Sequence, residues 1–195
     1  MEKTEIIEFF DTLAPRWDAD QVPKDRIINI ILDLAQAREG ADVLDVACGT
    51  GVLFPFYEER RAGSVTGVDI SSEMARRAAE KVQGNGRFRI LCGDAEAMSF
   101  DRDFDLVMIY NAFPHFPRPE NTVAAMARCL KPGGRFCVAH SMSRAAVDAH
   151  HHGSAEKVSR GLMSIEELRA LFEPYFEIEV SISNDEMYQL VGVKR

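Results

Sequence analysis

Residues 42–51 read Asp-Val-Leu-Asp-Val-Ala-Cys-Gly-Thr-Gly, and this stretch decides how the rest of the chain is interpreted. Its first six residues are rich in apolar and β-branched side chains and end at a glycine-rich turn, which predicts a buried strand over 42–47. Glycine lets the backbone approach a ligand closely, and a helix that begins after the turn offers free N–H groups. We therefore expect a ligand site at this turn.

The spacing of the glycines separates this turn from two common nucleotide-binding turns. A dinucleotide-binding turn has the pattern G-x-G-x-x-G, and its third glycine would fall on Val52 or Phe54 here. A P-loop needs Gly-Lys-Ser/Thr, which is absent. A nicotinamide-dependent dehydrogenase is therefore only the second enzyme hypothesis.

Helix and strand patterns alternate outward from this turn. Short apolar runs predict strands at 64–69, 87–92, 104–110 and 134–140, and helical spacing predicts helices at 52–61, 71–83 and 119–130. A Ser164…Glu167 capping box opens another helix over 164–172. Strands at 176–183 and 187–193 are joined by three polar residues, which permit only an antiparallel hairpin. The alternation predicts a parallel sheet of about seven strands with helices on both faces.

The first forty residues predict two helices. Apolar residues between Glu2 and Leu13 recur every three or four positions, and Pro15 is expected to end this helix. A second helix begins at Pro23 and stops at Gly40. Trp17 lies in the expected break, where it either covers a ligand as part of a lid or packs on the sheet edge.

The composition fits a single globular domain. Hydrophobic residues make up 46% of the 195 residues, which excludes a disordered or collagen-like chain. The formal net charge of −8 disfavours binding to nucleic acid through its phosphates. The four cysteines include no C-x-x-C pair, and neither a signal peptide nor an apolar run of transmembrane length is found. We therefore expect a cytoplasmic protein with neither a nucleic acid nor a membrane as partner.

Five motifs in chain order resemble those of the class I S-adenosylmethionine-dependent methyltransferases. The first is residues 43–51, in which Ala47 replaces a glycine of the family pattern. The others are residues 65–71, which place an acidic residue at a strand end, and residues 92–95, 104–107 and 130–134. Residues 9–18 are similar to the opening of quinone-biosynthesis methyltransferases. A base-methylation motif of the Asn-Pro-Pro-Tyr type is absent after the fourth strand.

The resemblance implies a doubly wound, Rossmann-like α/β fold with strand order 3-2-1-4-5-7-6 and an antiparallel seventh strand. It implies a single class I methyltransferase domain over 1–195, with an N-terminal helical lid at 1–40, a cofactor-binding core at 41–140, a substrate-side segment at 141–163, and a helix with a C-terminal hairpin at 164–195. The implied reaction transfers a methyl group from S-adenosylmethionine to a small-molecule acceptor. A protein that binds S-adenosylmethionine without transferring the methyl group is the alternative. Neither the acceptor nor the oligomeric state is implied.

The resemblance also assigns residues to the cofactor. Asp69 would accept hydrogen bonds from the ribose hydroxyls, and Asp94 would accept one from the adenine amino group beside the Ala95 backbone. Each aspartate has an alternative role as a helix N-cap. Gly49 and Gly51 would lie against the amino acid portion. The remaining candidates are Asn111 at the methionyl end, Asp45 as a support of the turn, and Ala47, Cys48, Ile70 and Trp17 around it.

All five histidines fall between residues 115 and 152. His115 follows the expected fourth strand and His140 ends the fifth, so both should lie at the carboxyl edge of the sheet, where ligands bind. Either imidazole could be a general base for an acceptor that loses a proton. Two alternatives stay open, a polar pocket lining and a metal site formed by His140, His150, His151 and His152.

Overall fold

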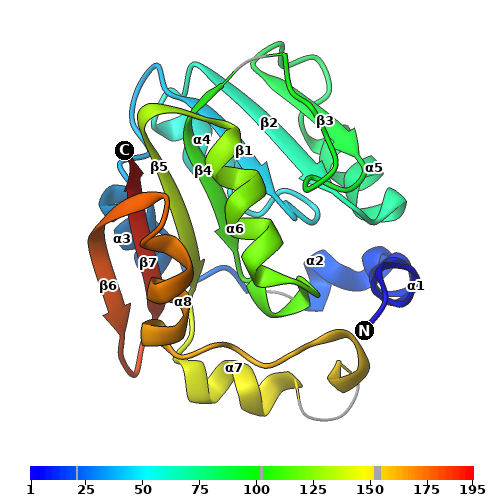
Figure 1. Cartoon of the computed structure of the whole chain (residues 1–195). Coiled ribbons are helices and arrows are strands. Elements are labelled where there is room, and N and C mark those ends of the chain that lie inside the picture. The colour runs from blue at the N-terminus through cyan, green and yellow to red at the C-terminus, as the bar shows by residue number, and fades with distance from the viewer. Residues whose placement is uncertain (21, 102, 152–154) are drawn as a thin grey trace.

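The computed structural model describes residues 1–20, 22–101, 103–151 and 155–195, and in these residues seven strands form one sheet (Figure 1). The order across the sheet is β3-β2-β1-β4-β5-β7-β6, which confirms the expected order. The strands are β1 (Asp42–Val46), β2 (Ser64–Asp69), β3 (Phe88–Cys92), β4 (Phe104–Tyr110), β5 (Leu130–His140), β6 (Phe176–Ser183) and β7 (Tyr188–Lys194).

The central strand β1 pairs in parallel with β2 and β4, so that Val46 lies opposite Val68 and Ile109. Strand β7 runs antiparallel to both β5 and β6, as the short connection before it requires. Because β1 to β5 are parallel, their carboxyl ends meet at one edge of the sheet. The loops that follow these strands can therefore build one site together.

Helices cover both faces of the sheet. Successive side chains of a strand point to opposite faces, so Val43 shares a buried apolar cluster with one helical layer and Leu44 with the other. The first layer contains α3 (Asp25–Leu34), α4 (Phe54–Glu59) and α5 (Ser72–Lys81), and the second contains α6 (Pro119–Arg128) and α8 (Ile165–Phe172). Helix α8 begins with the expected capping box.

Two element boundaries differ from the expected ones by four residues or more. Strand β5 begins four residues before the expected 134–140, because Leu130 already pairs with Phe104 ahead of an irregularity in the register. Helix α3 ends at Leu34 instead of continuing to Gly40. The φ angle of Gln36 is 54°, a left-handed conformation that ends helices.

The first helix ends at Leu13, two residues before Pro15, as expected, but the chain stays helical after it. Helix α1 (Lys3–Leu13) continues into a 3₁₀ turn, η1 (Ala14–Arg16), and then into the short helix α2 (Trp17–Asp20). Pro15 lies in the first turn of η1, where its missing N–H costs no hydrogen bond. Trp17 is therefore helical, and residues 3–20 form one continuous unit, which we call the cover.

The cover lies beyond the carboxyl edge of the sheet, where α1 contacts the 3₁₀ turn η3 (Glu156–Val158), which follows α7 (Arg144–His151) in the chain (Figure 1). Ile6 of the cover forms a small buried cluster with Ala155 and Val158. Two segments that are far apart in the chain thus meet above the strand ends. Within the described ranges, no helix has the length and apolarity needed to cross a lipid bilayer.

Candidate functional site

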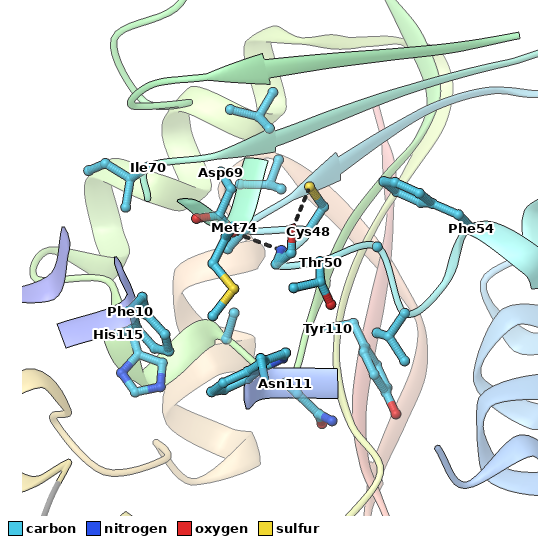
Figure 2. Close-up of a pocket in the computed structure, with 18 of the residues that line it drawn as sticks. Phe10, Cys48, Thr50, Phe54, Asp69, Ile70, Met74, Tyr110, Asn111 and His115 are labelled. Carbon is cyan, nitrogen blue, oxygen red and sulfur yellow. Dashed lines mark hydrogen bonds between the residues drawn. The ribbon is translucent and has the colours of Figure 1, made fainter. Parts of the chain in front are cut away.

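A cavity of about 550 Å³ lies between the carboxyl edge and the cover (Figure 2). Asp45 and His140 are outside its lining. The other residues that the sequence nominated for the cofactor or as a base all line it, namely Trp17, Ala47, Cys48, Gly49, Gly51, Asp69, Ile70, Asp94, Ala95, Asn111 and His115.

The glycine-rich turn has a left-handed backbone at three alternating positions. The φ angles are 55° at Ala47, 56° at Gly49 and 86° at Gly51. The N–H of Cys48 donates to the Val68 carbonyl over 3.1 Å, which ties the turn to β2. A Cβ on Gly51 would lie 2.4 Å from the Phe54 ring, so the position excludes any side chain. Ala47 adopts the conformation at the cost of some backbone strain.

Asp69 at the end of β2 is held by two backbone donors. Its Oδ2 accepts from the N–H of Gly49 over 2.8 Å and its Oδ1 from the N–H of Ser71 over 2.9 Å. Burial raises the pKa of Asp69 to about 6, although both hydrogen bonds act against this shift. The N-cap of α5 is Ser71, whose hydroxyl accepts from the N–H of Met74. The capping alternative for Asp69 is therefore wrong.

Asp45 lies on β1 beneath the turn and is only 2% exposed. Burial, and then the neighbouring charge of Asp69, raise its pKa well above the ordinary value. That Asp45 supports the glycine-rich turn stays a prediction. Because Asp45 does not line the cavity, direct contact with a ligand is not favoured.

Asp94 after β3 is joined to the cover. Its Oδ1 accepts from the N–H of Glu96 over 3.0 Å, which closes a turn and not a helix N-terminus. Its Oδ2 lies 2.5 Å from Nζ of Lys3, which also lies 2.6 Å from Oε2 of Glu96. The sequence alone did not indicate Lys3 or Glu96, because nothing local links the first helix to this loop.

The cover is also joined to the loops after β1 and β2. The Thr50 hydroxyl donates to Oδ1 of Asp18 over 2.5 Å, and Lys81 lies 2.7 Å from Oδ2 of Asp18. Asp11 accepts from the Ser71 hydroxyl and from the N–H of Glu73 at the start of α5. The cover is thus bonded to the loops after β1, β2 and β3.

Trp17 lies above the turn. Its indole nitrogen is 3.9 Å from the position that a Cβ on Gly49 would take. Its ring meets Phe10 edge-to-face, with centroids 5.7 Å apart. This geometry favours the lid role of Trp17 over packing on the sheet edge.

The ends of β4 and β5 form a polar cluster on the other side of the cavity. The Asn111 side chain accepts from the N–H of Ser141 over 3.0 Å and donates to the Ser141 hydroxyl over 3.3 Å. The φ angle of Asn111 is 53°, which places this side chain across the gap between the two strands. Burial raises the pKa of Tyr110, which keeps its phenol neutral beside Asn111 and Ser141.

The two histidines proposed as bases have different surroundings. His115 lies in the turn η2 (Phe113–His115) and lines the cavity beside Phe10, with ring centroids 5.0 Å apart (Figure 2). Its Nδ1 lies 2.6 Å from the Val158 carbonyl. His140 is 2% exposed and packs edge-to-face on Tyr188, because its position in β5 directs it into the core. We therefore do not retain His140 as a base.

The metal alternative stays a prediction. His152 lies outside the described residues, and no group of three His, Cys, Asp or Glu among the residues the structure describes could hold a metal ion. Helix α7 ends at His151, so the histidine triplet lies at the junction between described and undescribed chain.

Comparison with known proteins agrees with this architecture. A family model described as a methyltransferase domain matches residues 43–134. Nocamycin O-methyltransferase from Saccharothrix syringae is 38% identical over 65% of this chain and 48% of its own length. Demethylmenaquinone methyltransferase from Thermus thermophilus is 35% identical over 66% of this chain and 62% of its own length. The matches thus span about half to three-fifths of these relatives.

Among solved structures, a SAM-dependent methyltransferase from Aquifex aeolicus superimposes with a TM-score of 0.75 at 17% identity. The match covers 95% of this chain and 98% of that one. At this identity the likeness establishes the fold alone.

Proposed function

We propose that this chain is a class I, S-adenosylmethionine-dependent methyltransferase that transfers the methyl group of S-adenosylmethionine to a hydroxyl oxygen of a small, apolar acceptor. Its match to a methyltransferase domain over residues 43–134 and its similarity to named methyltransferases support the proposal. One observation carries the proposal. The loops after β1, β2 and β3 bring Gly49, Asp69 and Asp94 to the edge of one cavity. A flexible amino acid, a ribose and an adenine are joined in this order in the cofactor.

The residues present fit such a cofactor. A Cβ on Gly49 would project toward Trp17 with no other heavy atom within 4 Å, so the glycine leaves room beside the turn. Asp69 would accept from the ribose hydroxyls and Asp94 from the adenine amino group. When bound, the cofactor supplies a methyl group that its sulfonium already activates, so the protein has mainly to align the acceptor and exclude water.

His115 is the proposed general base. A carbonyl oxygen only accepts, so Nδ1 of His115 donates to Val158 and the lone pair of the neutral ring lies on Nε2. Nε2 would take the proton from the acceptor hydroxyl as the S–CH₃ bond breaks and the O–CH₃ bond forms. The cover, through Trp17 and Phe10, would keep water from the methyl group.

The apolar side chains on the acceptor side of the lining favour an uncharged acceptor, because an ammonium group placed against them would lose its hydration. Aromatic and thioether side chains supply apolar surface on the acceptor side, from Phe10, Trp17, Phe116 and Met142.

Calorimetric titration with S-adenosylhomocysteine tests the cofactor assignment. We expect binding by the wild-type protein, a loss of about tenfold or more in Asp69→Ala through the removed hydrogen bonds, and no change in Asp33→Ala on the exposed face of α3. Absence of binding by the wild-type protein would contradict the proposal.

A panel of phenols, enols and amines, scored by S-adenosylhomocysteine release, tests the transfer. Turnover of a hydroxyl compound supports it. Tight binding of S-adenosylhomocysteine without turnover of any acceptor would instead favour a cofactor-binding protein, and preferential turnover of amines would contradict the proposed hydroxyl acceptor.

A further inference from the structure

The loop that carries His115 is held from outside by residues 158–160. The Val158 carbonyl lies 2.6 Å from Nδ1 of His115. The backbone N–H of Arg160 donates to the Pro114 carbonyl over 3.0 Å, and Nη1 of Arg160 donates to the Pro117 carbonyl over 2.6 Å. Three hydrogen bonds therefore span the loop from just before the imidazole to two residues after it.

Val158 is itself anchored. Its side chain is 3% exposed and packs with Ile6 of the cover and with Ala155. Its carbonyl is therefore a fixed acceptor, in contrast to a carbonyl in a solvated loop. The same cover residues that enclose the cavity thus also support the group that faces Nδ1 of His115.

We propose that Arg160 is a positioning residue that clamps the 114–117 loop onto Val158 and so keeps His115 in its Nδ1–H form. Arg160 is exposed as a residue, its guanidinium reaches the far end of the loop, and no ion pair to a carboxylate is found for it in the described ranges. Its one side-chain hydrogen bond there goes to the loop. The relevance of this tautomer to catalysis rests on the proposed function, whereas the clamp itself does not.

In the clamp, a neutral carbonyl selects the tautomer of His115, a task that a carboxylate performs for many catalytic histidines. A hydrogen bond to one ring nitrogen selects which nitrogen carries the proton. A carbonyl does this without adding negative charge, so it does not stabilise the imidazolium as strongly as a carboxylate would.

Nitrogen-15 NMR of histidine-labelled protein tests the proposal without any acceptor. The His115 resonances are assigned by their loss in His115→Gln. We expect a wild-type neutral ring protonated at Nδ1. Arg160→Ala should shift the ratio of the two tautomers by about tenfold, the effect of one lost hydrogen bond. Arg160→Lys, which keeps a donor, should retain most of the wild-type signal.

Arg169→Ala is the matched control, because Arg169 pairs with Glu173 on α8. An Nε2–H tautomer in the wild-type protein, or an unchanged His115 spectrum in a folded Arg160→Ala variant, would overturn the proposal. Titration of the same samples with S-adenosylhomocysteine separates the two hypotheses: failure to bind counts against the proposed function, and an intact affinity with a shifted tautomer supports the clamp.

Discussion

Nζ of Lys3 lies 2.5 Å from Oδ2 of Asp94, although the two residues are 91 positions apart in the chain. The first residue of the cover thereby reaches the loop proposed to bind adenine. Burial, the largest single influence, acts to lower the pKa of Lys3, but the hydrogen bonds that Lys3 donates to Asp94 and Glu96 and their negative charges raise it above the ordinary value. The lysine is therefore charged and links the cover to the site.

Removal of this link should loosen the cover. We expect Lys3→Ala to accelerate dissociation of S-adenosylhomocysteine about two- to fivefold, because partly exposed ion pairs contribute modestly. Trp17, the single tryptophan of the chain, reports the event by stopped-flow fluorescence. Arg169→Ala should leave the rate unchanged, and a rate in Lys3→Ala equal to that of the wild type would show that the pair does not hold the cover.

Binding of S-adenosylhomocysteine should strengthen as the pH rises through about 6. The pKa of Asp69 in the cofactor-free protein is about 6, and ribose hydroxyls favour the ionised carboxylate, so binding below this pH releases a proton. Affinity should rise by up to about tenfold per pH unit below pH 6 and level off above it. Calorimetry between about pH 5 and pH 8 measures this, and Asp69→Asn should bind weakly with a flat profile.

The raised pKa of Asp69 also determines how the stability of the protein depends on pH. Ionisation of Asp69 opposes folding of the cofactor-free protein, so its contribution to stability is complete below the ordinary pKa of 3.8 and is lost as the pH rises through about 6. We expect S-adenosylhomocysteine to raise the melting temperature more at neutral pH than at about pH 5. An equal rise at both pH values would argue that Asp69 does not contact the ligand.

Gly51→Ala should lower the stability of the protein more than Gly84→Ala does. The φ angles are similar, 86° and 82°, so the backbone strain of an added Cβ is matched. A Cβ on Gly51 would meet the Phe54 ring at 2.4 Å, whereas one on Gly84 would meet nothing within 4 Å. We expect a free energy of unfolding lower by about 2 kcal/mol in Gly51→Ala than in Gly84→Ala, measured by urea denaturation.

Substitutions of Ala47 test how much backbone strain the glycine-rich turn tolerates. Ala47→Gly should change the free energy of unfolding by less than about 1 kcal/mol, because relief of a left-handed alanine offsets the greater freedom of unfolded glycine. Ala47→Val should cost about 2 kcal/mol, since a β-branched residue rarely adopts this conformation. Equal stabilities of the valine and glycine variants would show that the turn adopts another backbone in solution.

Substitutions of His115 and His140 should have different effects, one on catalysis and the other on stability. With an acceptor from the panel, His115→Gln should lower kcat by about a hundredfold while the affinity for S-adenosylhomocysteine is kept. His140→Gln should instead lower the melting temperature, because His140 is buried against Tyr188. A His115→Gln variant with wild-type kcat would remove the proposed base.

Local patterns in the sequence were sufficient for the strands and the glycine-rich turn, whereas the strand order was predicted from the family resemblance. The short apolar and β-branched run of β1, the glycines at 49 and 51, and Asp69 at a strand end are each determined by a few neighbouring residues. Parallel pairing then brings the strand ends together, so the positions of Asp69 and Asp94 on one edge could be predicted.

Contacts between distant segments were decided only by the tertiary structure. His115 and His140 both end up near the carboxyl edge, yet the side-chain direction of β5 buries one while the turn after β4 brings the other to the cavity. The bonds from Lys3 to Asp94 and from Arg160 to Pro117 depend on how the cover and residues 158–160 dock. The physical reason is that periodicity and turn chemistry act over a few residues, whereas docking depends on the packing of surfaces that no single stretch of sequence contains.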